Sequence, residues 1–187
     1  CTKGWVSLAR ISIRSCFLRF LNATGIAFVA ILSVPALAAE DASGLAVNLP
    51  DTFVVAAEPS PPPYDVTFGV KSAADDPAPL EGEKYLCQVS FQNVPANAGL
   101  SVEEINKQIG SPEWLAMAKG GMSQIFDFVG DSAFELDGYN GHEFIGKPKQ
   151  KGAEQVRLVL SMVETARGRT AISCVTDADR LDSVLPV

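Results

Sequence analysis

Hydrophobic and polar residues alternate along much of the chain after residue 50, and a period of two predicts β-strands. Tyr64 to Lys71 places every second residue on one apolar face. Lys84 to Val94 does the same, with Cys87 among the apolar positions. Glu154 to Thr165 has apolar residues on both faces, which is typical of an inner strand of a sheet. Further strands are expected at Thr52 to Ala57, from Phe126 to Leu136 with an interruption, at His142 to Gly146, and at Thr170 to Thr176.

Two helices are predicted between the third and fourth of these strands. Ser101 and Glu104 have the spacing of a capping box, so the first helix should begin there and end at Gly110. Ser111 followed by proline predicts the start of a second helix. A last helix is expected after Asp177, which has the residue type of an N-cap. The second helix has an apolar stripe that should face the core, made of Trp114, Leu115, Ala118, Met122 and Ile125.

The order of the predicted elements is β-β-β-α-α-β-β-β-β-α, and it indicates an α+β fold. Asn140-Gly141 is predicted as a two-residue hairpin turn, because both residues tolerate positive φ. We expect one antiparallel sheet of about six or seven strands with two or three helices packed on it. This single domain should cover residues 52–187, with its last helix truncated, after a flexible segment over residues 40–51.

The segment over residues 1–39 is typical of a cleavable secretory signal peptide. It carries four positive charges and no negative one, and an uncharged run extends from Phe20 to Ala39. Ala36 and Ala38 fit the A-x-A cleavage pattern, with the cut after Ala38 or after Ala39. An uncleaved membrane anchor is the alternative, because a membrane-spanning helix needs about 20 apolar residues and the run from Phe20 to Ala39 just reaches that length. Pro35 and polar residues interrupt the run, so we expect cleavage and export to the periplasm by the general secretion route.

Composition limits the partners of the exported chain. The part that remains after cleavage, residues 40–187, has a length that suits one domain. All 22 acidic residues and 11 of the 15 basic ones lie in this part, so its net charge is 11 − 22 = −11. Nucleic acids and anionic membranes demand a basic surface. We therefore expect no nucleic-acid partner and no binding to anionic membranes. We also expect no stable membrane insertion after cleavage, and a monomer.

Two cysteines, Cys87 and Cys174, follow the predicted signal peptide. An oxidising compartment favours a disulfide between them. A reactive thiol is less favoured, because neither cysteine lies in a C-x-x-C motif or at a predicted helix N-terminus. Two separate buried thiols are the third possibility.

The residues that usually carry enzyme chemistry are scarce. His142 is the only histidine, so a His-rich zinc site is excluded and a Ser/His/Asp triad has one possible base. The sequence contains no G-x-S-x-G, no glycine-rich phosphate loop and no calcium-binding loop. It therefore predicts no catalytic residue, no cofactor and no metal ligand. A pocket near His142, with Tyr139 and Glu143, is the alternative that an enzyme or ligand carrier would need.

Several segments resemble the PsbP/DcrB-like superfamily. They are the run from Asp137 to Phe144, the strand from Val156 to Val163, the strand from Thr170 to Thr176 and the helix after Asp177. The resemblance implies an α+β sandwich and an exported accessory or binding protein. It implies no common catalytic set, so no residue role is transferred. The proline-rich segment from Pro59 to Pro63 departs from the family pattern.

The leading interpretation is a non-enzymatic periplasmic protein that acts as a binding or accessory module in the cell envelope. Its partner would be a protein or small molecule of unknown identity. The alternatives are a small periplasmic enzyme or ligand carrier, and an acidic metal-buffering protein. A deep pocket beside His142 would favour an enzyme or carrier, and a flat exposed apolar patch would favour an accessory protein.

Overall fold

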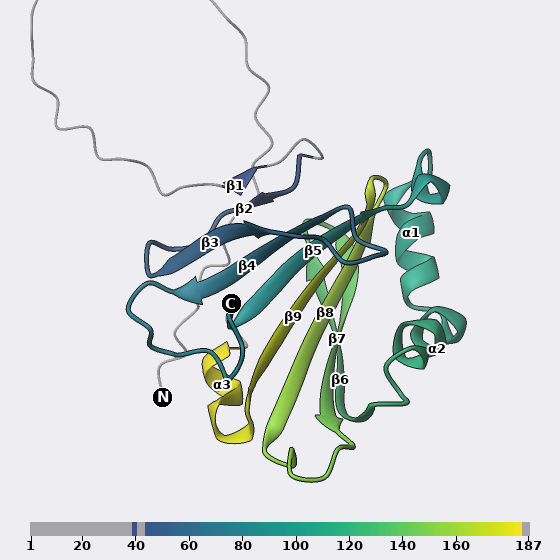
Figure 1. Ribbon diagram of the computed structural model, residues 1–187. Helices are drawn as coiled ribbons and strands as arrows, with labels where there is room; N and C mark the ends of the chain where they lie inside the picture. The colour runs from purple at the N-terminus through teal and green to yellow at the C-terminus, as the bar shows by residue number, and fades with distance from the viewer. Residues whose placement is uncertain (1–38, 41–43, 185–187) are drawn as a thin grey trace, which may run out of the picture.

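The computed structural model describes residues 39–40 and 44–184, and its main feature is a twisted sheet of seven strands (Figure 1). The strand order is β3-β4-β5-β9-β8-β7-β6, and every neighbouring pair is antiparallel. This architecture confirms the α+β class. The strands are β3 (Phe53–Glu58), β4 (Val66–Ser72), β5 (Cys87–Asn93), β6 (Phe126–Leu136), β7 (Tyr139–Pro148), β8 (Val156–Thr165) and β9 (Gly168–Asp177).

The sheet consists of two groups of strands that are each consecutive in the sequence. Strands β3 to β5 form one group and β6 to β9 form the other, and the two groups meet where β5 pairs with β9. The link from β5 to β6 contains a short 3-10 helix, η1 (Pro95–Asn97), followed by α1 (Val102–Ile109) and α2 (Pro112–Gly120). After β9 come η2 (Ala178–Arg180) and α3 (Leu181–Val184). Helices α1 and α2 lie beside the β6–β9 group, away from α3 (Figure 1).

Each face of the sheet carries its own apolar cluster, because neighbouring residues of a strand point to opposite faces. In β8, Leu160 packs in the cluster under α1 and α2, whereas Val159 packs in the cluster on the other face. Both faces of β8 are therefore covered by apolar clusters, and the strand lies inside the sheet between β7 and β9, as predicted. The helix-side cluster consists of Ile105, Ile109, Trp114, Phe144, Leu160, Met162 and Ala171.

The opposite cluster contains a disulfide at the junction of the two strand groups. Cys87 of β5 and Cys174 of β9 are directly paired across the ladder, with Cα atoms 4.0 Å apart, and their sulfurs are bonded. Both residues are almost completely buried. The disulfide expected from an oxidising compartment is thus present, and it joins segments that lie 87 residues apart in the sequence.

Part of the segment expected to be flexible is packed on this second cluster. Val47 is only 7% exposed, and Leu45 and Leu49 pack beside it. Two-residue strands β1 (Ala39–Glu40) and β2 (Ala46–Val47) pair with each other. The prediction of a flexible start is therefore wrong for residues 45–49. Three apolar residues at alternate positions are enough to hold a segment to an open apolar face, although the run is too short to stand out as a strand.

The hairpin between β6 and β7 turns three residues earlier than predicted. Asp137 and Gly138 both have positive φ, at 50° and 85°, and Leu136 pairs with Tyr139. The predicted turn at Asn140-Gly141 is wrong, since both residues lie within β7. Asp-Gly and Asn-Gly favour the same tight turn, and the register across the two strands decides between them.

Helix α1 has the predicted capping box, with Ser101 and Glu104 bonded to each other's backbone N–H. Helix α2 begins after its predicted cap, Ser111, and ends at Gly120. Its predicted apolar stripe is therefore wrong at Ile125, which is 59% exposed. Ile125 lies beyond the end of α2 at Gly120, so the helical spacing no longer determines which way its side chain faces. Asp177 stands at the N-cap position of η2 without the capping hydrogen bond that was expected.

The predicted signal peptide, including Ala36 and Ala38, lies outside the described residues, apart from Ala39 at the start of β1. Residues 185–187, at the end of the predicted domain, also lie outside them. Within the part of the chain that is described, no helix combines the length and apolar character needed to cross a membrane.

Candidate functional site

His142 lies on β7 and is held by contacts on several sides. Its ring is stacked on Phe144, with centroids 5.9 Å apart and planes 16° apart. The indole of Trp114 lies at the same centroid distance, tilted by 43°. Nδ1 is 3.4 Å from Oδ1 of Asp131 on β6, and the side chain is only 14% exposed. These contacts fix the ring between α2 and the sheet.

Tyr139 and Glu143, the other residues expected beside a pocket, do not converge on His142. Glu143 follows His142 in the strand, so its side chain points to the opposite face. There its carboxylate accepts a hydrogen bond of 3.2 Å from Ser161 Oγ on β8. Tyr139 packs against the helix-side cluster at the start of β7. The three residues therefore do not form the expected pocket.

A hollow of about 220 Å³ lies elsewhere, where the segment before β5 meets β5 and β9. Tyr85 forms part of its wall, and its hydroxyl donates a short hydrogen bond to Glu58 Oε1. Lys84 Nζ donates to the same oxygen at 2.7 Å, and the pKa of Lys84 is raised to about 12, chiefly by this hydrogen bond. The lining residues are Glu83, Tyr85, Leu86, Cys87, Gln88, Ser173 and Val175.

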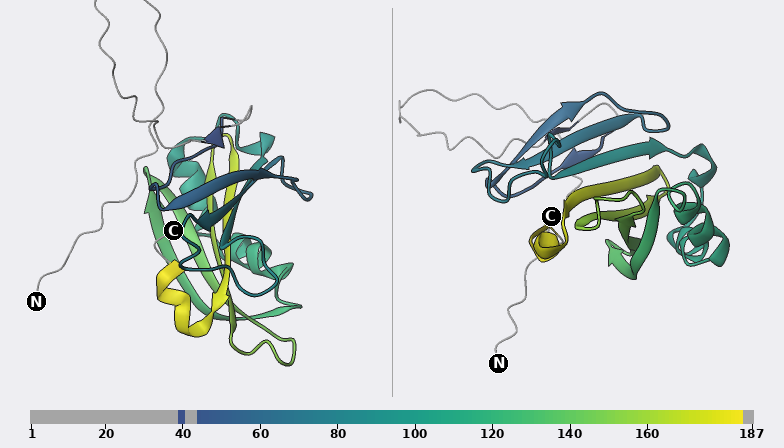
Figure 2. Two further views of the ribbon diagram at one scale, coloured as in Figure 1. Left: turned by 60° about the vertical axis from the view of Figure 1, so that its left-hand side comes forward. Right: turned by 60° about the horizontal axis from the view of Figure 1, so that its bottom comes forward.

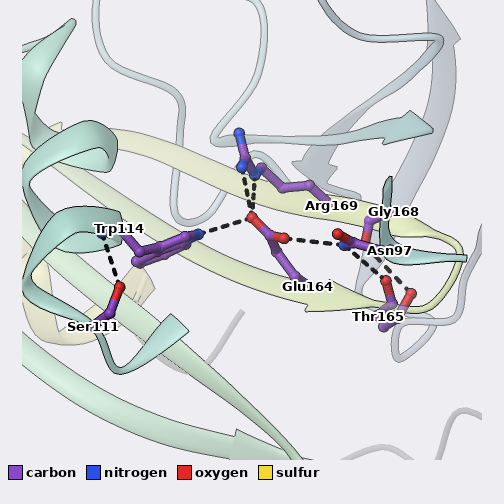
Figure 3. A network of polar contacts seen from close by, with 7 residues as sticks. All are labelled: Asn97, Ser111, Trp114, Glu164, Thr165, Gly168 and Arg169. Carbon is purple, nitrogen blue, oxygen red and sulfur yellow. Dashed lines mark hydrogen bonds and ion pairs between the residues drawn. The ribbon is translucent and has the colours of Figure 1, made fainter. Parts of the chain in front are cut away.

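Among the described residues, the buried polar group with the most hydrogen bonds is the carboxylate of Glu164 on β8 (Figure 3). Oε1 accepts from Trp114 Nε1 at 2.8 Å, and from Nε and Nη2 of Arg169 at 2.9 and 2.5 Å. Oε2 accepts from Asn97 Nδ2 at 3.0 Å. Asn97 also donates to the carbonyl of Thr165, at 3.1 Å. One carboxylate thus holds α2 and η1 to the turn between β8 and β9.

Opposing effects act on the pKa of this carboxyl. Burial raises the pKa of Glu164, but the hydrogen bonds from Trp114, Asn97 and Arg169 lower it further than burial raises it. The net pKa lies below its ordinary value of 4.5, so the group is ionised at neutral pH. Because both oxygens are occupied by donors from the protein, Glu164 is a structural anchor.

A second polar group lies closer to the surface, where the last turn of α2 passes over β6 and β7. Lys119 Nζ donates a short hydrogen bond to Oδ2 of Asp131. The same ammonium lies 5.1 Å from the ring centroid of Phe144 and 5.8 Å from that of Phe128. The hydrogen bond from Lys119 lowers the pKa of Asp131, and partial burial of the carboxyl raises it by less. The contact with His142 also lowers this pKa. A carboxylate and two aromatic rings therefore surround one cation.

Strand β6 forms one outer edge of the sheet (Figure 2), and it carries Asp131 and Phe128 of this group. It is 11 residues long, and a bulge lies between Phe128 and Gly130. Val129 at the bulge and Ile125 just before the strand are each 59% exposed. Ile125, Val129, Asp131 and Lys119 are called the β6 edge surface below.

Sequence reasoning missed the residues that build both polar groups. Glu164, Trp114, Asp131 and Lys119 read as parts of ordinary strand and helix patterns. The one available signal was a charged residue at a helix-facing position of an otherwise apolar inner strand, which describes Glu164. Among the described residues, no group of three or more His, Cys, Asp or Glu side chains is placed to hold a metal ion.

Comparison with known proteins yields a likeness of fold. No protein-family model matches the chain, and no curated protein sequence matches it. The fold is similar to the solution structure of the cyanobacterial PsbP protein (CyanoP) from Synechocystis sp. PCC 6803. The two chains share 13% identity over 83% of this chain and 91% of that chain, with a TM-score of 0.49. The likeness concerns the arrangement of strands and helices, and no residue role is transferred from it.

Proposed function

We propose that the chain is an exported, non-enzymatic binding module of the cell envelope whose protein partner binds at the β6 edge surface. The observation that carries this proposal is the long outer strand β6 with its exposed apolar residues. Val129 lies on this strand and Ile125 lies just before it, and each is 59% exposed. Exposed apolar side chains mark an interaction site when they lie close together, and Ile125 and Val129 lie four positions apart along one segment at the edge of the sheet. An edge strand also offers unpaired backbone groups to an extended segment of a partner.

The export part of the proposal is supported by the disulfide and by the leader-like sequence that precedes Glu40. Disulfides such as Cys87–Cys174 persist in oxidising compartments and are rare in the cytosol. The non-enzymatic part is supported by the placement of His142, whose ring is packed between two aromatic side chains.

Site-specific photocrosslinking in the native host tests the binding surface. A benzoyl-phenylalanine placed at Val129 should crosslink to one defined protein. Val54 is the matched control, because it is also an exposed valine on an edge strand, β3, at the other side of the sheet. Identical products from both positions, or no product from Val129, would contradict the proposal.

Export is tested on protein isolated from the same host. The N-terminal residue should be Ala39 or Glu40, and Cys87 and Cys174 should resist alkylation until a reductant is added. A chain that still carries the segment before Ala39, or that has two alkylatable thiols before reduction, would refute export.

A further inference from the structure

The ammonium of Lys119 occupies a site that the sheet provides. Asp131 of β6 accepts its hydrogen bond, and the rings of Phe128 and Phe144 lie 5.8 and 5.1 Å from it. The two rings meet edge to face, with centroids 5.9 Å apart. Cations bind at this range above aromatic faces because the ring quadrupole attracts positive charge. The site thus combines the two kinds of group that recognise an organic cation.

The sheet also orients this site independently of Lys119. Phe144 is completely buried, so its ring has little freedom. Oδ1 of Asp131 faces His142 Nδ1 at 3.4 Å, while Oδ2 faces Lys119. The side chains of Asp131 and Lys119 remain 38% and 30% exposed, so solvent reaches both. A second cation therefore has access to Asp131 if Lys119 withdraws.

Helix α2, which carries Lys119, is held less firmly than α1. Ile105 and Ile109 of α1 are 1% and 0% exposed, whereas Trp114 is the only buried residue of α2. Lys119 stands one residue before Gly120–Gly121, the end of the helix. Segments with few buried apolar contacts open at lower free energy than the rest of a fold. The last turn of α2 is therefore suited to move away from β6.

We infer that Asp131, Phe128 and Phe144 form a binding site for a lysine or arginine side chain of the partner, and that Lys119 fills this site in the unbound chain. The inference rests on the proposed binding at the β6 edge surface and names the chemistry of that partner. Ile125 and Val129, along the same edge, would contact apolar residues that flank the basic one. Charge supports a basic partner segment, since the chain has 22 acidic and 15 basic residues. A second copy of this chain would instead bring the acidic residues of its own β6 to the same edge.

The experiment removes Lys119 and supplies its side chain as a small molecule. Nα-acetyl-lysine methylamide is titrated into the full-length Lys119→Ala variant and followed by NMR signals of His142 and by melting temperature. The variant should bind this probe about fivefold or more tightly than the unaltered chain, because an internal competitor has been removed. Nα-acetyl-norleucine methylamide, which lacks the charge, should bind neither. Adding Asp131→Asn to Lys119→Ala should abolish binding.

Lys149→Ala is the matched control. Lys149 Nζ lies 3.4 Å from Asp127 Oδ1, also on β6, and this pair is more exposed than the pair of Lys119 and Asp131. The control should bind the probe no better than the unaltered chain. Any of three results would overturn the inference. The Lys119→Ala and Lys149→Ala variants could bind the lysine probe equally tightly, the norleucine probe could bind as tightly as the lysine probe, or Lys119→Ala could bind the lysine probe no more tightly than the unaltered chain.

The probe needs no partner, so its result is separate from crosslinking at Val129. Failure of the Val129 crosslink would overturn the proposed function. Failure of the probe to bind would overturn the cation site alone. Light scattering could also show a molar mass of two copies that falls to one copy when Val129 is substituted. This result would show that the occupant is a second copy of this chain, and it would overturn the inference.

Discussion

At the scale of single residues, a buried carboxylate stabilises the fold because every donor around it is fixed by a different element. Glu164 receives hydrogen bonds from a helix residue, Trp114, and from a residue of η1, Asn97. Arg169 on the adjoining strand supplies the opposite charge. A buried ion pair contributes little net stability compared with apolar residues, but removing one partner leaves the other unpaired. Loss of the Glu164 carboxylate should therefore leave Arg169 unpaired and remove the bond that holds Trp114 of α2 to β8.

Glu164→Gln should lower the free energy of unfolding at pH 7 by about 2–4 kcal/mol. The amide keeps one acceptor oxygen but presents an N–H group to the donors and leaves Arg169 without a counter-charge. Urea denaturation measures the change. Glu135→Gln, at an exposed position of β6, is the control and should change stability by less than about 0.5 kcal/mol. Equal effects of the two substitutions would contradict the anchoring role.

The difference between the unaltered chain and Glu164→Gln should depend on pH. The pKa of Glu164 is lower in the folded chain than its ordinary value of 4.5. A lowered pKa gives stability that is fully present above the ordinary value and is lost as the pH falls through the folded value. Urea denaturation from pH 7 to pH 3 should therefore show the two free energies of unfolding converging in acid. A constant difference over this range would show that the charge of Glu164 is not responsible.

At the scale of elements, the β6–β7 hairpin shows how register is fixed by close packing across a strand pair. Gly141 pairs with Phe134, and a Cβ atom at Gly141 would lie 2.3 Å from the phenyl ring. Asn106 of α1 bonds the turn and the strand that follows it, donating to the carbonyl of Gly138 and accepting from the N–H of Asn140. The helix and the ring together hold the turn at Asp137-Gly138.

Gly141→Ala should cost about 1–3 kcal/mol of stability through overpacking against Phe134. In a Phe134→Ala background, the same substitution should cost less than about 1 kcal/mol, because the clash is gone. Denaturant unfolding of the four proteins measures this coupling. Gly138→Ala is the control: its φ is +85° and no atom lies within 4 Å of the added Cβ, so its cost should not depend on Phe134. Absence of coupling at Gly141 would indicate a turn at Asn140-Gly141.

At the scale of the whole molecule, the fold joins two strand groups along a single ladder. In the seven-stranded sheet as described, the β5–β9 pairing is what connects the β3–β5 group to the β6–β9 group. The disulfide lies in that ladder, and the segment around Val47 packs over it. Loss of this covalent link would leave the association of the two groups to hydrogen bonds and apolar contact.

Reduction of Cys87–Cys174 should destabilise the chain by about 4–5 kcal/mol on the chain-entropy model, because the closed loop is long. Melting with and without a reductant measures the effect. A Cys87→Ala/Cys174→Ala double variant should melt near the reduced form and should not respond to reductant. A melting temperature that is the same for oxidised and reduced protein would show that the junction is held by noncovalent packing alone.

Residue types and their spacing were enough to place most elements of this protein. Alternation of apolar residues predicted the strands, the Ser101–Glu104 spacing predicted the cap of α1, and the two late cysteines predicted the disulfide. These features are local, or depend only on compartment, so they can be read along the chain. The order of elements then restricted the chain to an antiparallel α+β fold.

The residues that meet in the polar groups were set by the packing of distant segments. Trp114 and Asn97 reach Glu164 from 50 and 67 residues away in the sequence. Three further features depend in the same way on which strands and helices become neighbours. They are the turn at Asp137-Gly138 in place of Asn140-Gly141, the packing of Val47, and the Lys119–Asp131 pair. A period of two reports which residues share a face of one strand, and the packing of the whole sheet determines what that face contacts.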